Sequence, residues 1–391
     1  MSERLVLVSD LHLGGGAETA RWGPGFADEF DGDEAFPAFL EWLTSTAHRS
    51  SRLVLLGDTI DFLRVPVAGA LYARNDAEAI CQLEQIAAAH PKVFEALSTT
   101  AGRGIGIDIV VGNHDVELAR PSVQNRLRAL LAPSGESATD GDAVRFHLWS
   151  YYVPGVLYAE HGNHYSEVNS FHRPLSPVQG GRTERPLGPR LGSARRLLFP
   201  GDPGQPLFRQ VAADVVANDR LARAARDEYR DRVLADYAAE IGLPVSAVRR
   251  LHELGARSAG ATAVRIAKVR LTGSMSFREA SWHVAAAVHG MLADAGSSVP
   301  FCVFGHTHTA CHLQLNGGDG VYLNTGTWST DMGRAVPGRR AVPHPPRRTW
   351  VEVTTSQGSD GPRSRLLRWV GAPVEIPGPT SGVSDQVVGR R

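Results

Sequence analysis

The sequence has few cysteines, and this scarcity excludes two classes of small protein. Only Cys81, Cys302 and Cys311 occur among 391 residues, and their spacing fits neither a zinc cluster nor a disulfide framework. Cys302 lies inside the apolar run Val299–Phe304, where we expect a buried, unreactive thiol. We therefore expect a reducing compartment.

Long apolar runs and an excess of one charge are also lacking. No stretch approaches the ~20 apolar residues of a membrane span, and no secretory signal precedes the first strand-like run. Lys plus Arg equals Asp plus Glu, at 41 each, so the net charge gives no reason to expect nonspecific nucleic-acid binding. The sequence predicts a cytoplasmic protein without a membrane or nucleic-acid partner, and indicates no oligomeric state.

What the sequence does contain is five short motifs of metal-ligating residues, each after an apolar run. The motifs are Asp10-x-His12, Gly57-Asp58-x-x-Asp61, Gly112-Asn113-His114-Asp115, His161-Gly162-Asn163 and Gly305-His306-Thr307-His308. The runs before them are Leu5–Val8, Leu53–Leu56, Ile105–Val111, Val156–Ala159 and Val299–Phe304. Continuous apolar runs of this length are typical of buried parallel strands, and ligands bind beyond the carboxyl ends of such strands. The motifs therefore predict one site.

The spacing within the motifs suits metal binding. Residues two apart in an extended segment point to the same face, so Asp10 and His12 can reach one cation, as can His306 and His308. Asp58 can bridge two cations because a carboxylate has two oxygens.

Two neutral ligands complete the candidate set, the amide of Asn113 and the imidazole of His161. The set mixes nitrogen and oxygen donors and contains no thiolate, which suits Mn²⁺, Fe or Zn²⁺ better than soft ions. We predict two divalent cations, with Mn²⁺ as the first choice.

In order and residue type, the motifs resemble those of the calcineurin-like metallophosphoesterases: D-x-H, G-D-x-x-D, G-N-H-D/E, a lone His and G-H-x-H. The resemblance is specific at the motifs and says little about the stretches between them. It implies an α/β fold, a four-layer α/β/β/α sandwich of two mixed sheets flanked by helices. It also implies hydrolysis of a small phosphomonoester or phosphodiester by a hydroxide that two cations hold and activate.

The resemblance also distributes the ligands between the cations. The first cation would be held by Asp10, His12 and His308, the second by Asn113, His161 and His306, and Asp58 would bridge both.

The resemblance also implies that His114 assists the leaving group. From their places in the motifs, Asp115 could orient His114. Asp61 would support the site from behind, or would simply be a carboxylate at a helix N-terminus. Asn113 and His164 are candidate substrate contacts. His164 stands where many family members have an acidic residue, however, and an ordinary loop histidine is the favoured alternative.

The rest of the chain shows helical periodicity and turn signals. Helices are expected over Glu34–His48, Ala77–Leu97 with a break at Pro91, Val123–Leu131, 206–241 and Ser276–Ala295. Further strands are expected over Arg145–Tyr152 and Val321–Asn324, and a hairpin over Thr349–Thr355 and Arg365–Val370.

We interpret residues 1–164 and 296–371 as the catalytic domain and 165–295 as a mostly helical insertion, a lid or specificity element. Residues 372–391 are expected to be a disordered tail. The five arginines of Arg182–Arg196 would form either a phosphate-binding lid or a solvated loop.

Two other functions stay open at this point. One is a pyrophosphatase acting on a nucleotide-sugar lipid or a nucleotide, although such enzymes commonly have Arg where this chain has His114. The other is a non-catalytic metal-binding scaffold, whose relatives usually lack that histidine. A repair-type DNA nuclease shares the motifs, but the zero net charge disfavours it.

Overall fold

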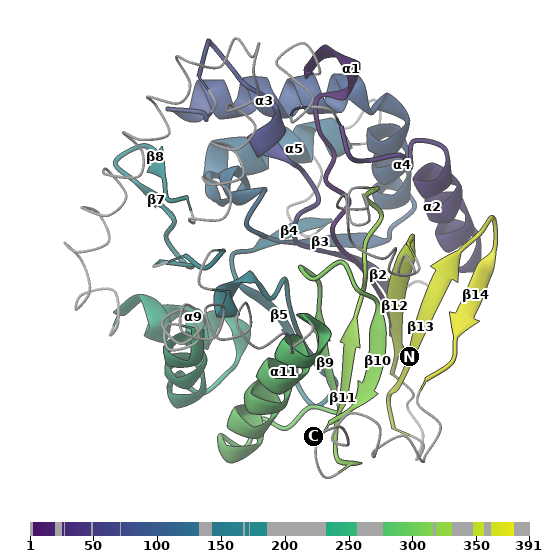
Figure 1. Ribbon diagram of the computed structural model, residues 1–391, viewed down its shortest axis with the longest axis vertical. Coiled ribbons are helices and arrows are strands. Elements are labelled where there is room, and N and C mark those ends of the chain that lie inside the picture. Colours follow the sequence, from purple (N-terminus) through teal and green to yellow (C-terminus); the bar gives the residue numbers. More distant parts are fainter. Residues whose placement is uncertain are drawn as a thin grey trace, which may run out of the picture.

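The computed structural model describes residues 3–19, 26, 28–47, 50–70, 72–132, 143–166, 169–171, 173–185, 232–255, 277–315, 318–330, 347–355 and 361–378. Within these ranges the chain forms two mixed β-sheets with helices on their outer faces (Figure 1). The predicted mixed α/β class with two sheets is confirmed.

The first sheet has seven strands in the described residues. Their order is β14 (Pro373–Ile376), β13 (Arg363–Trp369), β12 (Thr349–Thr354), β1 (Arg4–Val8), β2 (Ser51–Leu56), β3 (Gly106–Val110) and β4 (Val144–His147). Strands β1 to β4 are parallel, whereas β12 to β14 form an antiparallel extension next to β1. The carboxyl ends of β1, β2 and β3 therefore lie side by side.

The second sheet has five strands in the described residues. Their order is β10 (Cys311–Gln314), β11 (Val321–Asn324), β9 (Phe301–Phe304), β6 (Leu157–Glu160) and β5 (Ser150–Val153). Strands β6, β9 and β11 are parallel, and β5 and β10 run antiparallel at the edges. A separate hairpin joins β7 (Val178–Gln179) to β8 (Arg182–Thr183).

Helices connect and cover the strands. Those of the first half are α1 (Gly16–Thr19), α2 (Ala35–Thr46), α3 (Asp76–Ala89), α4 (Pro91–Gly102) and α5 (Pro121–Leu131), with short 3₁₀ turns η3 (Phe62–Arg64) and η4 (Val116–Ala119). Those of the second half are the 3₁₀ turn η5 (Asn163–Tyr165), α9 (Leu234–Ile241), a helix over 245–255 and α11 (Phe277–Asp294). The predicted break at Pro91 is confirmed, because proline is tolerated in the first turn of α4 and cannot continue α3.

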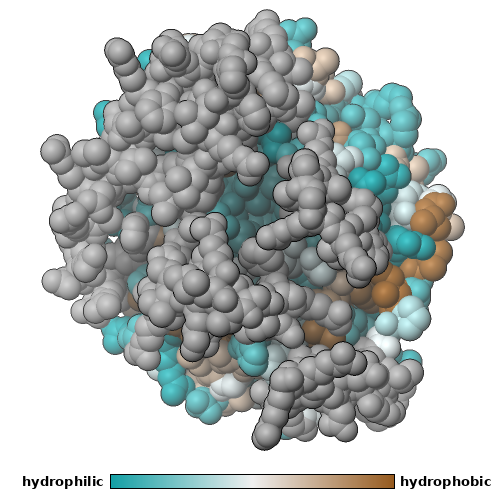
Figure 2. Space-filling model, in the orientation of Figure 1, coloured by the Kyte–Doolittle hydropathy of each residue, from teal (hydrophilic) through white to brown (hydrophobic). Residues whose placement is uncertain are grey.

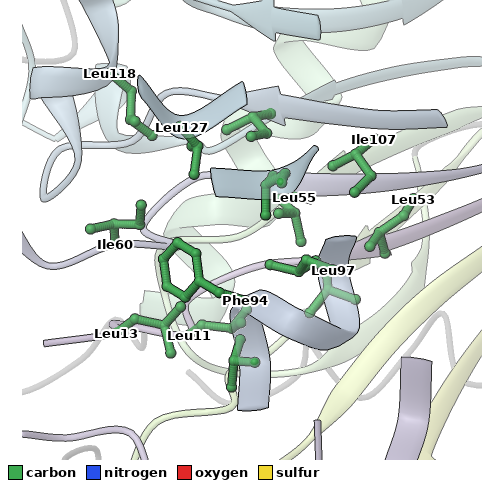
Figure 3. Packing of buried hydrophobic residues seen from close by; sticks show 14 of the residues in the cluster. Leu11, Leu13, Leu53, Leu55, Ile60, Phe94, Leu97, Ile107, Leu118 and Leu127 are labelled. Atoms are coloured by element: carbon green, nitrogen blue, oxygen red, sulfur yellow. The ribbon is translucent and has the colours of Figure 1, made fainter. Parts of the chain in front are cut away.

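Three apolar clusters define the layers. On the outer face of the first sheet, Leu53, Leu55 and Ile107 lie alongside Phe94 and Leu97 of α4 (Figure 3). A second cluster fills the space between the two sheets, and a third packs α9 and α11 onto the outer face of the second sheet. The order helix, sheet, sheet, helix is that of the expected four-layer sandwich.

Two expectations from the sequence need correction. The run Arg145–Tyr152 is not one strand, because β4 pairs with β3 in the first sheet and β5 pairs with β6 in the second. Residues 373–376, assigned to a disordered tail, form strand β14, which pairs antiparallel with β13 at the edge of the first sheet. Residues 379–391 lie outside the described ranges.

Three further features concern the helices, the cysteines and the surface. Among the helices described, none combines the length and apolar character needed to cross a bilayer. Cys81, Cys302 and Cys311 are free, and burial raises the pKa of the Cys302 thiol, which keeps it unreactive. In the orientation of Figure 1, Figure 2 shows a recessed hydrophilic surface near the centre of the molecule.

Candidate metal centre

The five motifs meet where the two sheets meet. Asp10, Asp58 and Asn113 follow β1, β2 and β3 of the first sheet, while His161 and His306 follow β6 and β9 of the second. The parallel strands of each sheet end at a shared edge, and these two edges face each other. Residues as far apart in the sequence as 10 and 308 therefore come into contact.

One group of ligand atoms comprises Asp10, His12 and His308, all within 4.8 Å of one another. The Nε2 atom of His308 lies 3.1 Å from Oδ1 of Asp10 and 3.2 Å from Nε2 of His12. A second group, with the same spread, comprises Asp58, His161 and His306.

Asp58 contacts members of both groups. Its Oδ2 atom lies 3.1 Å from Nε2 of His161 and 3.8 Å from Nε2 of His12. Its Oδ1 atom accepts a 2.8 Å hydrogen bond from the backbone N–H of His114, which fixes the carboxylate between the groups.

Several donor atoms of the centre are buried without a hydrogen-bond partner among the described residues. They are Oδ1 of Asp10, Oδ1 of Asn113 and Nε2 of His161. An unsatisfied buried polar atom costs roughly 1–3 kcal/mol, and two bound cations, one at each group, would satisfy these atoms. The donors are carboxylate and amide oxygens and an imidazole nitrogen, so the residues fit a hard or borderline divalent cation.

The backbone of the centre is strained at the ligand positions. Of the seven non-glycine residues with positive φ in the described chain, five are candidate ligands: Asp10, His12, Asp58, His306 and His308, with φ between 49° and 66°. This conformation costs roughly 1–3 kcal/mol per residue and is concentrated at functional sites. The strain turns successive side chains toward one point.

Glycines in the motifs allow the strand ends to approach closely. A Cβ atom on Gly57 would lie 2.5 Å from Cγ of His161, and one on Gly112 would lie 2.5 Å from the backbone nitrogen of Asp58. Real Cβ atoms essentially never make contacts this short. A side chain at either position would therefore displace a candidate ligand.

The electrostatics match the protonation states that metal ligands need at four of the candidate ligands and differ at His161. Burial raises the pKa of Asp10 and Asp58, but the neighbouring histidines outweigh it and hold both pKa values below the usual range. Burial lowers the pKa of His12, and lowers the pKa of His306 to about 3, so both imidazoles are neutral. Burial also disfavours charge on His161, yet Asp58 and Asp10 raise its pKa to about 10. A cation at that position would replace the proton.

The second nitrogen of His161 is fixed by the fold. Its Nδ1 atom lies 3.0 Å from the backbone carbonyl of Leu56, the last residue of β2. Donation from Nδ1–H to this carbonyl directs Nε2 at Asp58, so that Nε2 would offer its lone pair there once a cation replaced the proton, the orientation in which metal-bound histidines are usually held.

Asp61 holds the two histidines that face it. Its Oδ2 atom lies 3.1 Å from Nδ1 of His114 and 3.4 Å from Nδ1 of His12, and accepts a 2.9 Å hydrogen bond from Nε of Arg64. Its Oδ1 atom accepts a hydrogen bond from the N–H of Leu63 at the start of η3. Each predicted role of Asp61 therefore fits a different oxygen. Oδ2 supports the site, and Oδ1 is the carboxylate oxygen at the helix N-terminus.

Asp115 lies elsewhere than expected. Its two oxygens accept hydrogen bonds from the backbone N–H groups of Gly112, at 2.6 Å, and Thr59, at 2.9 Å. Burial and the charge of Asp58 raise its pKa. The structure thus brings Asp61, rather than Asp115, to the His114 ring, while Asp115 ties the second motif to the third; the expected role is corrected accordingly.

His164 is also placed differently. It is buried, at 5 % exposure, and its ring packs edge-on against Trp149. The centroids of the His164 and Phe171 rings lie 6.1 Å apart. Burial and the nearby His161 lower its pKa to about 3, so it is neutral. This packing corresponds to the alternative of a structural loop histidine and not to the expected substrate contact.

Two residues near the centre carry no sequence signal. Asn169 lies in the pattern-poor stretch after the fourth motif, and its Nδ2 atom is 3.2 Å from Nε2 of His306. Arg64 lies three residues after Asp61 and bridges it to Glu29.

The arginine-rich segment is described only at its start. Arg185 is buried, forms an ion pair with Glu117 and lies over the Tyr72 ring at 4.2 Å. The remainder of Arg182–Arg196, from residue 186 on, lies outside the described residues.

Comparisons with known proteins add little to this geometry. Neither a protein-family model nor a curated protein sequence matches the chain. Among solved structures, the chain is similar to the phosphopantetheinyl hydrolase of Mycobacterium tuberculosis at 11% sequence identity and a TM-score of 0.26, covering 88% of this chain and 99% of that one. Similarity at this level carries no weight for fold or function.

Proposed function

We propose that this chain is a metal-dependent phosphoesterase of the calcineurin-like type, hydrolysing a phosphomonoester or phosphodiester. One observation carries the proposal: two groups of His and Asp ligand atoms, drawn from four strand ends, meet at Asp58, which belongs to the second group and lies 3.8 Å from His12 of the first. The motif pattern and the position of His114 beside this centre support the same reaction class.

The residues divide as the motif pattern implies. Asp10, His12 and His308 would hold one divalent cation, Asn113, His161 and His306 the other, and Asp58 would face both. Such cations bind phosphoryl oxygens and lower the pKa of bound water, which is the chemistry that phosphoester hydrolysis requires. The oxygen-containing ligand set favours Mn²⁺, with Fe and Zn²⁺ as the other candidates.

His114 is the residue of this set that can meet a substrate. Its side chain is 20% exposed, whereas that of Asp58 is 2% exposed. With Nδ1 facing Asp61, the opposite ring nitrogen can donate a proton to a departing alkoxide oxygen. Asp61 would fix the tautomer and stabilise the charged ring, and Arg64 would in turn hold Asp61.

The proposed domain division also follows the packing. Residues 1–164 and 296–371 would form the catalytic unit, and residues 165–295 an insertion. The described part of this insertion covers the second sheet with α9 and α11 and brings Asn169 to the centre. We infer that it shapes the substrate side of the site.

The test compares hydrolysis of p-nitrophenyl phosphate and bis-(p-nitrophenyl) phosphate with added Mn²⁺, together with the metal content of the purified protein. We expect bound cations and turnover in the parent, and loss of both in Asp58→Asn. Asp294→Asn, which removes an exposed carboxylate on α11, is the matched control and should behave like the parent.

The outcomes separate the competing functions. Cleavage of the monoester or of the diester identifies the substrate class. Bound cations without hydrolysis of either ester would favour the non-catalytic scaffold, and a folded protein that takes up no cation would rule out the centre itself.

A further inference from the structure

The two carboxylate oxygens of Asp10 have different surroundings. Oδ1 is buried without a hydrogen-bond partner among the described residues, and it lies 3.1 Å from Nε2 of His308 and 3.8 Å from Nε2 of His12. Oδ2 instead accepts hydrogen bonds from the hydroxyl of Ser9 and, at 3.0 Å, from the backbone N–H of His306. Oδ1 therefore faces the two other candidate ligands of the first group, and Oδ2 is held by the protein.

The hydroxyl of Ser9 has a second partner, the hydroxyl of Thr325 after β11. The two oxygens lie 2.5 Å apart, and the residues are buried, at 1% and 0% exposure. They are separated by 316 positions in the sequence and belong to none of the five motifs. Their contact links the strand end that carries Asp10 to the second sheet.

The charge of Asp10 determines the direction of these hydrogen bonds. Ser9 has one hydroxyl proton, and a carboxylate accepts it more strongly than the carbonyl of Gly326, which lies 3.5 Å away. The Ser9 oxygen can then accept from Thr325, whose other acceptor, the carbonyl of Phe304, is more distant at 3.3 Å. Thr325 thus donates to Ser9, and Ser9 donates to Oδ2 of Asp10. Each bond in such a chain polarises the next.

The backbone makes room for this chain of hydroxyls. Successive side chains of an extended strand point to opposite faces, so Ser9 and Asp10 would ordinarily point apart. At Asp10 the chain leaves the extended conformation, with a φ of 54°, and the carboxylate meets the Ser9 hydroxyl. A Cβ atom on Gly305 would lie 2.5 Å from Oγ of Ser9 and 2.8 Å from Oδ2 of Asp10. The pair therefore requires a glycine at the start of the fifth motif.

We propose that Ser9 and Thr325 are positioning residues of the candidate metal centre, holding Oδ2 of Asp10 so that Oδ1 faces the first cation. That cation is the one assigned to Asp10, His12 and His308, so the inference rests on the proposed function. Ser9 acts on the carboxylate directly, and Thr325 acts through Ser9. Hydrogen-bond partners of a ligating carboxylate typically change metal affinity by about 10- to 100-fold.

The experiment is titration calorimetry with Mn²⁺ on metal-free protein, comparing the parent with Ser9→Ala, Thr325→Val and the double variant. An Asp10→Asn protein identifies the Mn²⁺ site to which Asp10 contributes. We expect Ser9→Ala to weaken that site by about 10- to 100-fold and to leave the other site at parental affinity. Thr325→Val removes the hydroxyl with little change of shape and should weaken the same site less.

The double variant tests whether Thr325 acts through Ser9. Residues in one hydrogen-bonded chain have non-additive effects, so the double variant should bind Mn²⁺ no more weakly than Ser9→Ala alone. Thr325→Ser retains a hydroxyl and should keep the parental affinity. Ser45→Ala is the matched control, because this exposed serine of α2 bonds to the carbonyl of Trp42, far from any candidate ligand in the sequence. Thermal melts of the metal-free proteins check folding.

The outcomes separate a positioning role from a merely structural one. Ser9→Ala with two Mn²⁺ sites of parental affinity would overturn the inference and leave the proposed function intact, even if its metal-free melt were lower. Equal weakening of both sites would also overturn it, because the loss would not act through Asp10. An additive double variant would remove the role of Thr325.

A variant that fails to fold does not end the test. Should Ser9→Ala be unfolded, Thr325→Val measured against Thr325→Ser decides the same question, and equal Mn²⁺ affinities in these two proteins would overturn the inference. A parent that binds no Mn²⁺ would remove the proposed function and the inference together.

Discussion

At the scale of the residue, His114 can be altered without removing a proposed ligand. Its ring contacts Asp61, and its backbone N–H donates to Asp58. We expect His114→Ala to lower kcat by about 10²- to 10⁴-fold, the range typical of lost general acid–base help, while two cations remain bound. Steady-state kinetics and metal analysis on one preparation check this.

Asp61→Asn serves as the companion variant, because it keeps the shape of the side chain and removes its charge. It should lower kcat less than His114→Ala does and should alter the pH profile of kcat. Parental turnover in His114→Ala would show that another group assists the leaving oxygen.

Gly112 tests the close approach of the strand ends. The added methyl of Gly112→Ala would collide with the backbone and carboxylate of Asp58, so we expect weaker Mn²⁺ binding and a lower free energy of unfolding. Gly290→Ala is the control, because this exposed glycine of α11 has open space around it and should gain about 0.5–1 kcal/mol from helix propensity. Calorimetric titration and urea unfolding measure both; unchanged Mn²⁺ affinity in Gly112→Ala would contradict the steric argument.

The candidate ligands could be read from the sequence, and their hydrogen-bond partners could not. Asp10 and His12 follow an apolar run at strand spacing, a local pattern that the sequence displays directly. That Asp61 and not Asp115 reaches His114, or that Asn169 reaches His306, depends on how separate loops turn after their strands. Positive φ values at the candidate ligands set the direction of those turns. The residue types Asp and His do not predict a positive φ.

At the scale of the element, the parallel strands and the α3–α4 break were predictable because apolar runs and Pro91 act locally. The division between β4 and β5 was not, because the run from Arg145 to Tyr152 has strand character throughout. The chain changes sheets within it, and only the pairing partners decide where. Strand β14 likewise depends on its pairing with β13. Its first residue is Pro373 and Pro377 follows it, and both prolines indicate a turn when the sequence is read alone.

The buried His90 contacts two carboxylates of the segment that precedes α2. His90 lies between α3 and α4, with Nε2 2.8 Å from Oδ2 of Asp28 and Nδ1 2.8 Å from Oδ1 of Asp33. Asp28 also accepts from the N–H groups of Gly16 and Phe30. Burial lowers the pKa of His90, but the two carboxylates outweigh it, so the folded pKa is raised above the ordinary 6.5.

The sign of the pH dependence follows. A raised folded pKa contributes stability that is fully present below about pH 6.5 and is lost as the pH rises through the folded value. We expect His90→Gln to destabilise the protein by about 1–3 kcal/mol at low pH, with the difference from the parent shrinking as the pH rises. Urea unfolding of both proteins across this range measures it.

Asp33→Asn is the partial control, since the Asp33 side chain is 44% exposed and its loss should cost less. A difference between His90→Gln and the parent that grows with pH would show that His90 is neutral in the fold.

At the scale of the whole molecule, the candidate centre joins the two sheets. The backbone N–H of His306, after β9, donates to Oδ2 of Asp10, after β1, at 3.0 Å. Ser9, after β1, contacts Thr325, after β11, through their hydroxyls at 2.5 Å. Behind these contacts lies the apolar cluster between the sheets. The sandwich is therefore held apolar at its middle and polar at one end, and the polar end carries buried carboxylates that repel one another unless something positive lies between them.

Bound cations should consequently stabilise the entire fold and not the site alone. Their ligands come from both sheets, so unfolding either sheet would release them. A ligand present at 100 times its Kd adds about 2.7 kcal/mol to the free energy of unfolding, and two independent sites add more. We expect thermal melts with Mn²⁺ to lie several degrees above melts with a chelator, as one cooperative transition. The shift should disappear in Asp58→Asn and persist in Asp294→Asn. If the chelated protein melts in two steps and the Mn²⁺ form melts in one, the cations couple the two sheets more strongly than the apolar layer between them does. Identical melts with and without Mn²⁺ would contradict a centre shared between the sheets.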